Sequence, residues 1–494
     1  MIGEALKDLL RYLPSRVVPG LVAIAAIPVL TRLLPPAEYG RYTLALSAVA
    51  LFTALTSSWL TTSAIRFVPS YEQPEQLGRG VGLLAALFLI ALAGGSMAVG
   101  VGGVLLTLRG SLPGAFVALA VVLCAATASH DFLLGLLRSR RRATTFTTLT
   151  SILGTAGYAL AVAMAILIQP SAPAVVGGFL LAVVLVVPFT GRMALRGVAP
   201  RFSSLRSEET REILRYGLPA LVINGLTWVA VLSDRYVLAI AQGESAVGIY
   251  AASRDLSDKA IALLNTLFLL ASTPVGMTVW ERDGEDAARA YVVNLTRYYL
   301  LAATPLAVGI GVLAQPLIGF LADARYHEGY RLVPFVAAGA VCAGLATRYT
   351  LGLSFRKRTG LLSLCYLGAG VINLGLNLVL VPRYGYMAAA AANLIAFLAL
   401  LTLVWAASRS LFAWPFPVAT GTRVGVAVTL MGFLVWLTTR SIASPGLQLA
   451  VGVPVGMTAY ALAILAVGAL EPRERAILAR RLGLRRRDQP SLRS

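Results

Sequence analysis

Long apolar segments alternate with short polar connections along most of this chain. Each apolar segment is close in length to the ~20 residues that an α-helix needs to cross a bilayer. There are fourteen of them, at residues 17–34, 42–65, 81–106, 114–137, 145–168, 174–191, 217–240, 249–276, 291–313, 331–354, 361–381, 386–406, 418–439 and 447–470. The connections leave no room for an independent water-soluble domain. The pattern therefore predicts an all-α polytopic membrane protein with about fourteen transmembrane helices.

Composition supports this prediction. Hydrophobic residues make up 58% of the chain and charged residues 13%, whereas soluble proteins are roughly one-quarter charged. Cys124, Cys342 and Cys365 all fall inside apolar segments, so we expect small buried hydrophobes rather than disulfides. We expect no cleavable signal peptide, because the first apolar segment is too long for one and contains Pro19 and Pro28.

The charge of the chain is strongly basic, with 42 Lys and Arg against 22 Asp and Glu. Most basic residues lie in or beside the two tails and the connections that follow the second, fourth and later even-numbered apolar segments. They include the runs 138–142, 356–358 and 485–487. Positive charge collects on the cytoplasmic side of membrane proteins, so we expect a protein of the cytoplasmic membrane with both termini in the cytoplasm. The runs should face anionic membrane lipid, and we expect no nucleic-acid partner.

The two halves of the chain resemble each other. Residues 11–14 recur as 215–219, and residues 134–141 match 351–358 at an offset of 217. Both copies have the same sidedness, which predicts two parallel six-helix repeats arranged as pseudo-symmetric lobes around a central cavity. The expected division is an N-terminal lobe (1–200), a C-terminal lobe (201–410), and two extra helices with a basic cytoplasmic tail (411–494).

Three stretches resemble one known family. Residues 29–40, Asp234-Arg235 with residues 246–250, and residues 372–385 are similar to the polysaccharide and O-antigen flippases. This resemblance implies a member of the multidrug/oligosaccharidyl-lipid/polysaccharide exporter superfamily. Such proteins move oligosaccharides linked to undecaprenyl pyrophosphate, or a similar polyprenyl carrier, across the membrane by alternating access for cell-surface polysaccharide biosynthesis. An ion gradient, of protons or sodium, is the family's usual energy source.

Charged side chains inside the predicted membrane segments are functional candidates, because each costs about 2.5 to 3.5 kcal/mol to insert. Six lie on the seventh and eighth segments: Asp234, Arg235, Arg254, Asp255, Asp258 and Lys259. One hypothesis is a self-compensated ion network, with pairs at i,i+4 from residue 254 to 258 and from 255 to 259. The other is that the three bases bind the substrate pyrophosphate, while the three acids limit the positive charge of the empty site or take part in ion coupling.

A second pair of charges follows from the repeat, because the offset of 217 maps Asp131 onto Arg348. We hypothesise that these two residues meet across the lobe interface and close an inner gate; the alternative is that Asp131 pairs within its own lobe. Arg66, at the cytoplasmic end of the second segment, is either a receiver of the incoming phosphate or another topology anchor.

The sequence gives less support to other functions. There is no phosphate-binding loop for ATP, no metal site is expected from the sparse group of Asp323, His327 and Glu328, and no cofactor is expected. An enzyme acting on lipid-linked sugars is disfavoured because the longest outward connection is 314–330 and the chain has 2 histidines. A lipid II-type flippase, a multidrug exporter and a non-transporting scaffold remain alternatives. A polymerase or glycosyltransferase complex is a possible partner.

Overall fold

The computed structural model describes residues 14–71, 73–110, 113–140, 142–471 and 474. Within these residues the chain is helical and contains no strand. The helices are α2 (Pro14–Leu33), α3 (Pro36–Thr53), α4 (Trp59–Phe67), α5 (Pro74–Leu108), α6 (Gly114–Ser139), α7 (Ala143–Leu167), α8 (Ala172–Leu195), α9 (Glu208–Gln242), α10 (Glu244–Arg282), α11 (Gly284–Val312), α12 (Ala314–Leu321), α13 (Val333–Phe355), α14 (Thr359–Arg409), α15 (Val418–Thr439) and α16 (Pro445–Ala466). A π-helical turn, Ala54–Ser58, joins α3 to α4, and 3-10 turns cover Val68–Ser70, Phe202–Arg206 and Ala324–Leu332. The all-α prediction is confirmed.

The chain is a multi-pass membrane protein. Among the described residues, eleven helices are long and apolar enough to span a bilayer, or twelve if the bent α9 counts as one span. The count of fourteen is not confirmed. One reason is that α14 contains both predicted segments 361–381 and 386–406, with non-helical backbone at Gly385 between them. Another is that the apolar part of α2, Val17–Leu33, is shorter than the other spans.

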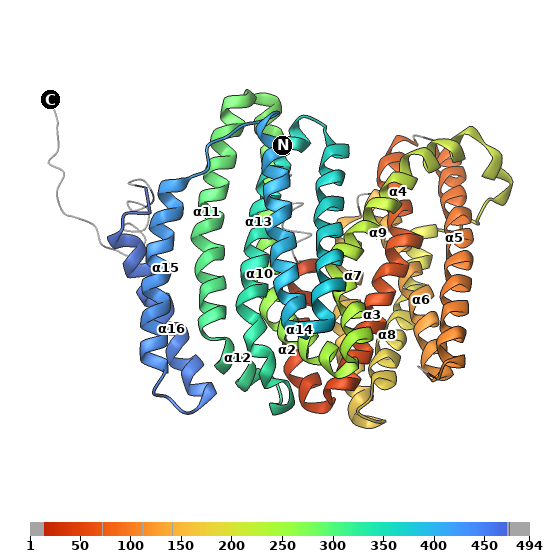
Figure 1. Cartoon of the computed structure of the whole chain (residues 1–494). Helices are drawn as coiled ribbons and strands as arrows, with labels where there is room; N and C mark the ends of the chain where they lie inside the picture. Colours follow the sequence, from red (N-terminus) through yellow and green to blue (C-terminus); the bar gives the residue numbers. More distant parts are fainter. Residues whose placement is uncertain (1–13, 72, 111–112, 141, 472–473, 475–494) are drawn as a thin grey trace.

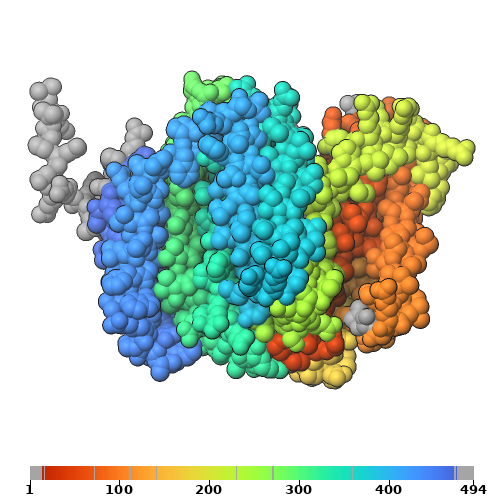
Figure 2. All heavy atoms as spheres, in the orientation of Figure 1, coloured from red at the N-terminus to blue at the C-terminus, as the bar shows by residue number. Residues whose placement is uncertain are grey.

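The helices form two groups that stand side by side (Figure 1). We call α2 to α8 the N-terminal group and α9 to α14 the C-terminal group. Helices α15 and α16 pack against α11 and α12, at the edge of the C-terminal group. Figure 2 shows the two groups as neighbouring bodies, with the first helices of the chain set back between them on this face. Residues 11–13 of the first repeat, and most of the basic tail, lie outside the described residues.

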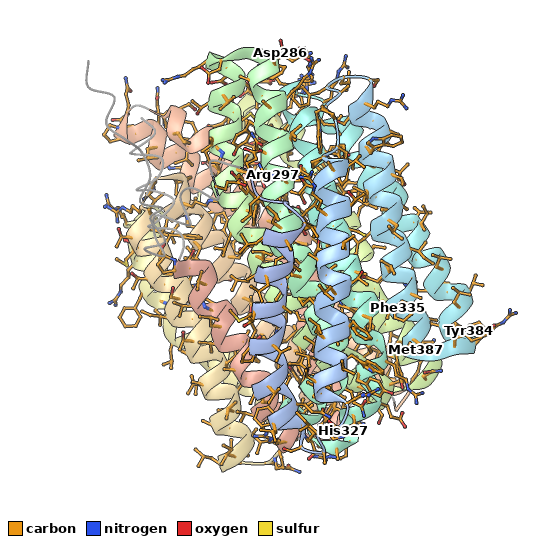
Figure 3. All side chains as sticks on the ribbon, turned by 90° about the vertical axis from the view of Figure 1, so that its left-hand side faces the viewer. Asp286, Arg297, His327, Phe335, Tyr384 and Met387 are labelled. Carbon is orange, nitrogen blue, oxygen red and sulfur yellow. The ribbon has the colours of Figure 1, made fainter. Side chains whose placement is uncertain are left out.

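We call the end of the molecule that holds the connection between α2 and α3 the hairpin end. The opposite end holds the connection between α10 and α11. In Figure 3, His327 lies near the first end and Asp286 near the second. Charge asymmetry predicts that the hairpin end faces outward.

At the opposite end, the first half of α9 leans onto the N-terminal group. The helix bends by 48° between Glu208–Val229 and Val231–Gln242. The Tyr216 ring meets the Phe67 ring edge-on at 5.7 Å between centroids, and the Tyr71 hydroxyl donates to the Glu209 carboxylate. Burial, together with this carboxylate, raises the pKa of Tyr71, so the hydroxyl stays protonated and keeps donating. The bent helix therefore contacts both groups.

Gly385 is where α14 reverses direction. Its backbone has φ 64° and ψ −147°, a conformation that is essentially restricted to glycine. A Cβ at this position would lie 2.2 Å from the Gln242 Oε1 atom. The glycine thus allows the reversal, and the amide end of the Gln242 side chain, at the end of α9, packs against it.

We expect Gly385→Ala to lower the midpoint of thermal unfolding in detergent, because it adds backbone strain of about 1–3 kcal/mol at a positive φ. The matched control is Gly375→Ala in the same helix, where an added Cβ meets nothing within 4 Å and helix propensity improves. Equal midpoints for the two variants would contradict the role of Gly385.

Candidate functional site

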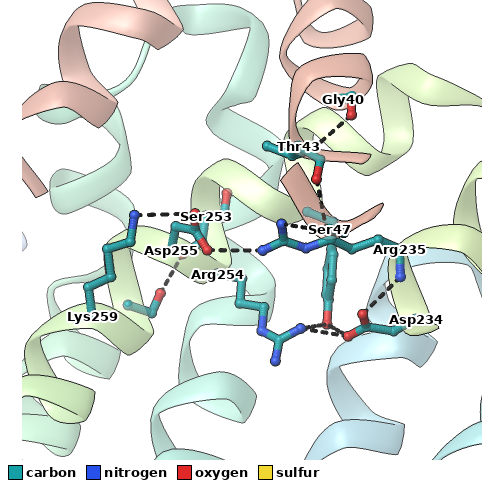
Figure 4. A network of polar contacts seen from close by, with 11 residues as sticks. Gly40, Thr43, Ser47, Asp234, Arg235, Ser253, Arg254, Asp255 and Lys259 are labelled. Carbon is teal, nitrogen blue, oxygen red and sulfur yellow. Dashed lines mark hydrogen bonds and ion pairs between the residues drawn. The ribbon is translucent and has the colours of Figure 1, made fainter. Parts of the chain in front are cut away.

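The six charged residues singled out in the sequence lie close together: Figure 4 shows five of them, and Asp258 of α10 interacts electrostatically with Arg254, Asp255 and Lys259. Asp234 and Arg235 come from the second half of α9, and the others come from the first half of α10. The two helices are joined at Gly243, whose φ of 83° permits the tight turn. This hairpin brings the two charged stretches side by side. We call these six residues the charged cluster.

The inner part of the charged cluster is a buried ion pair. The Arg254 Nη1 atom lies 2.7 Å from Asp234 Oδ2, and the Tyr250 hydroxyl donates to the same oxygen at 2.5 Å. Asp234 is 1% exposed and Arg254 6% exposed. Arg254 of α10 therefore pairs with Asp234 of the neighbouring helix α9. Among the described residues, no hydrogen bond or ion pair joins Arg254 to Asp258.

The outer part is partly exposed and less tightly paired. The Asp255 carboxylate is shared by Arg235 Nη2 at 3.2 Å and Lys259 Nζ at 3.4 Å. The Asp255 and Lys259 side chains are 21% and 26% exposed. Asp258 is also half-buried, and within the described part of the chain it has no hydrogen bond or ion pair.

The charged cluster also contacts the N-terminal group. Arg235 Nη1 donates to the Ser47 hydroxyl of α3 at 3.3 Å, and Lys259 Nζ lies 5.9 Å from the centre of the Tyr158 ring of α7. Trp228 Nε1 donates to the Ser47 carbonyl at 2.8 Å. These contacts place the charges at the interface of the two groups, where a movement of one group relative to the other changes their surroundings.

Three acids and three bases balance in number, but their environments differ. The pair of Asp234 and Arg254 is buried, and both residues also contact the Tyr250 hydroxyl, which agrees with the ion-network hypothesis. The sharing of Asp255 by two cations leaves each cation incompletely neutralised, on the side that is partly exposed. An anion with several oxygens can compete for such cations, so the outer part is the better candidate for ligand binding.

Asp131 and Arg348 lie in separate surroundings. The Ser57 hydroxyl donates to Asp131 Oδ2 at 2.7 Å, within the N-terminal group. The Arg348 guanidinium lies 4.7 Å from the centre of the Tyr299 ring and 5.3 Å from that of Phe268, within the C-terminal group. Arg348 is 1% exposed, and none of its guanidinium nitrogens has a hydrogen-bond partner among the described residues. The structure does not bring the two residues together as an ion pair.

Arg66 stands apart from the charged cluster. It lies in the last turn of α4, exposed, toward the end opposite the hairpin end. Cys124 and Cys365 are buried and Cys342 half-buried, all as free thiols. Within the described residues, no group of three or more His, Cys, Asp or Glu side chains is arranged to hold a metal ion.

Sequence reasoning missed three residues that complete the charged cluster: Ser47, Tyr158 and Tyr250. Tyr250 precedes Arg254 by four residues, so helical spacing alone could have placed its hydroxyl on the same face. Ser47 and Tyr158 belong to the other repeat, and nothing in the local sequence links them to Arg235 and Lys259, which lie 188 and 101 residues further along the chain. Only the packing of the two groups reveals them.

A buried arginine outside the cluster was also missed. Arg297 of α11, labelled in Figure 3, is 5% exposed. It pairs with the carboxylates of Glu471 and Glu474, which follow α16. Arg423 of α15 donates to the Gly468 carbonyl at 2.8 Å. The segment after α16 is thereby fixed to the C-terminal group.

These features define a helical membrane protein with two groups of helices that meet at a charged interface. The chain matches the model of the polysaccharide biosynthesis protein family over residues 6–277, which is more than half of its length. It belongs to that family, and the resemblance drawn from the sequence motifs is confirmed. An uncharacterized membrane protein of Methanocaldococcus jannaschii, MJ1068, is 23% identical over 225 residues, which is 43% of this chain and 42% of that protein.

Solved structures share the fold. The inward closed conformation of the lipid II flippase MurJ matches 97% of this chain and 100% of its own, with a TM-score of 0.73 at 12% identity. An inward-facing multidrug resistance transporter of the MATE family matches 81% and 97%, with a TM-score of 0.62 at 14% identity. A MOP superfamily transporter from Pyrococcus furiosus matches 82% and 95%, with a TM-score of 0.57 at 13% identity. At these identities the likeness establishes the fold alone.

We expect Arg254→Met to destabilise the protein by about 3–5 kcal/mol, because it leaves Asp234 charged and buried. The double variant Asp234→Asn with Arg254→Met removes both charges and should recover most of the loss. Thermal unfolding of the purified protein in detergent measures both. If the double variant is as unstable as Arg254→Met, the buried pair does not explain the loss.

Proposed function

We propose that this protein is a flippase that translocates polyprenyl-pyrophosphate-linked oligosaccharides across the cytoplasmic membrane by alternating access, for the synthesis of a cell-surface polysaccharide. The observation that carries the proposal is the charged cluster at the interface of the two groups, in a chain of the polysaccharide biosynthesis family with the MurJ and MATE fold. A substrate of this class has an anionic diphosphate, a hydrophilic glycan and an apolar tail. It therefore needs a cationic site inside the membrane.

The diphosphate would bind first to the outer part of the charged cluster. Lys259 and Arg235 share the Asp255 carboxylate at 3.4 and 3.2 Å, so a diphosphate oxygen can replace Asp255 without exposing a fully buried charge. Arg254 would join only if its pair with Asp234 opens. Arg66, at the end opposite the hairpin end, would attract the headgroup as it enters.

Coupling to an ion would use one of the acids. Asp258 is the best candidate, because Asp234 and Asp255 each accept a hydrogen bond from an arginine, whereas Asp258 has no such partner among the described residues. Protonation of Asp258 would raise the net charge of the charged cluster by one unit and favour an anionic headgroup. Sodium in place of a proton would act in the same direction.

The alternatives differ in substrate or in kind. A lipid II-type flippase is supported by the match to MurJ over nearly the full length of both chains, and its lipid diphosphate would use the same cations. A multidrug exporter would need net negative charge for cationic drugs, which the balanced cluster does not offer. A scaffold of a glycan polymerase or glycosyltransferase complex would need no functional charged cluster.

The deciding experiment is reconstitution into liposomes with a fluorescent polyprenyl-pyrophosphoryl oligosaccharide. Leaflet exchange is measured with and without an imposed proton or sodium gradient. We expect exchange by the wild type and at least about a tenfold loss in Lys259→Met, since one charge-assisted contact to a phosphate contributes roughly 1.5–3 kcal/mol. Lys259→Arg should keep most of the rate.

Two further variants are needed to interpret this assay. Arg211→Ala, an exposed arginine of α9, is the control and should transport normally. The double variant Asp234→Asn with Arg254→Met separates roles, because a normal rate would restrict those two residues to structure. Normal exchange in Lys259→Met would show that the outer part of the charged cluster is not the binding site. If the wild type shows no exchange but still assembles with glycan enzymes, the scaffold function is favoured.

The proposed inner gate has its own test. If Asp131 and Arg348 pair in the alternate conformation, the single variants Asp131→Arg and Arg348→Asp should each lose transport, and the charge-swapped double variant should regain part of it. The exchange assay above measures the rates, and the amount of protein in the membrane is the control. A double variant no more active than either single variant would count against the pair.

A further inference from the structure

The two groups of helices touch backbone to backbone where α3 and α10 begin. A Cβ atom added to Gly40 of α3 would lie 2.0 Å from the Glu244 carbonyl oxygen. One added to Gly248 of α10 would lie 1.9 Å from the Pro36 carbonyl oxygen. Neither neighbour is the end of a flexible side chain, so any larger residue would force the helices apart. We call these four residues the glycine crossing.

The glycine crossing is reciprocal. Gly40 follows Pro36 by four residues, and Gly248 follows Glu244 by four residues. Gly40 therefore lies against the Glu244 carbonyl, one helical turn before Gly248. Gly248 lies against the Pro36 carbonyl, one helical turn before Gly40. Such an exchange of equivalent contacts is the geometry of a two-fold axis. The axis implied by the internal repeat thus passes through this contact, and the two groups meet here as symmetry equivalents.

Polar contacts join the same two helices beside the crossing. Arg41 Nε lies 2.5 Å from Glu244 Oε2, across the interface, and Arg41 Nη1 lies 2.6 Å from Glu38 Oε1. Glu38 also accepts a hydrogen bond from the Ala172 backbone N–H at 2.7 Å, at the start of α8. These contacts are not repeated by symmetry, because Ile249 stands where the second repeat would need a basic residue.

Further contacts close the hairpin end around the crossing. The Tyr326 hydroxyl donates to the Leu34 carbonyl at 2.8 Å, and Arg32 Nη2 donates to the Phe320 carbonyl at 3.1 Å. Directly behind the crossing, Thr43 of α3 and Ser253 of α10 are buried. The contacts at the hairpin end therefore separate these side chains from the aqueous phase on that side.

We infer that the glycine crossing is the gate of the hairpin end, closed in this structure, and that it opens when the two backbones separate. This inference rests on the proposed alternating access. Close backbone packing through small residues is a strong contact inside a membrane, and it is lost as a unit once the helices part. The ion pair of Arg41 with Glu244 stabilises the closed state and breaks when the two helices separate.

Cysteine accessibility tests the inference without a substrate. Thr43→Cys is introduced after the three native cysteines are replaced by alanine, and a membrane-impermeant maleimide is added in turn to intact cells and to inverted vesicles. We expect slow modification in the parent. In Gly40→Ala with Gly248→Ala, the reaction from the side of the hairpin end should be at least about tenfold faster, because overpacking disfavours the closed state.

Two variants serve as comparisons. The control pair, Gly78→Ala with Gly94→Ala, adds Cβ atoms that meet nothing within 4 Å and should leave the rate unchanged. Glu244→Gln weakens the ion pair without adding bulk and should raise the rate by a smaller factor. It keeps the inference testable if the double alanine variant fails to reach the membrane.

The outcomes separate this inference from the proposed function. Faster modification in the crossing variants supports the gate even if the wild type moves no lipid-linked glycan. The gate is overturned, even if the wild type transports, when the modification rate is unchanged in both Glu244→Gln and the double alanine variant. If the double alanine variant does not reach the membrane, an unchanged rate in Glu244→Gln alone overturns it. Faster modification in the control pair would also overturn it.

Discussion

A charge inside a membrane needs a partner, and the arrangement of α9 and α10 follows from this constraint. The hairpin at Gly243 turns the chain so that Asp234 can neutralise Arg254 at 2.7 Å, with the Tyr250 hydroxyl completing the contacts. Once this pair is buried, the remaining charges occupy the boundary of the two groups. There Asp255 must serve both Arg235 and Lys259. The inner pair is thus buried, while the outer charges lie at the boundary of the two groups, where the proposed function places the ligand.

The internal symmetry of the chain is kept where backbones meet and broken where chemistry is expected. Gly40 and Gly248 exchange equivalent contacts, since two similar helices that cross on an axis must present the same surface to each other. Asp131 and Arg348, in contrast, occupy equivalent sequence positions with opposite charge. Arg348 lies beside the Phe268 and Tyr299 rings, which offset only part of the cost of burying a cation. A conformation that gives Arg348 a partner would therefore be favoured at this position.

The extra helices α15 and α16 are fixed at both ends of their attachment to the C-terminal group. Apolar side chains of α15 and α16 pack with Leu313 and with Leu301 of α11. Near the other end, Arg297 binds Glu471 and Glu474. Both acids follow α16 in the sequence, so these two residues are tied to α11 as well as to the extra helices.

The sequence by itself determined the membrane class, the helical fold, the family and the positions of the six intramembrane charges, because apolar length and charge insertion cost are local properties of the chain. It determined only some of the pairs: helical spacing correctly predicted the pair of Asp255 with Lys259, which lie 3.4 Å apart. Helical spacing suggested a pair between residues 254 and 258, but Arg254 turns to Asp234 on the neighbouring helix. Contacts such as Ser47 with Arg235, or Gly40 with the Glu244 carbonyl, depend on how two distant repeats pack. Only tertiary structure decides them, because the two partners of each contact come from different repeats and meet only when the helices pack together.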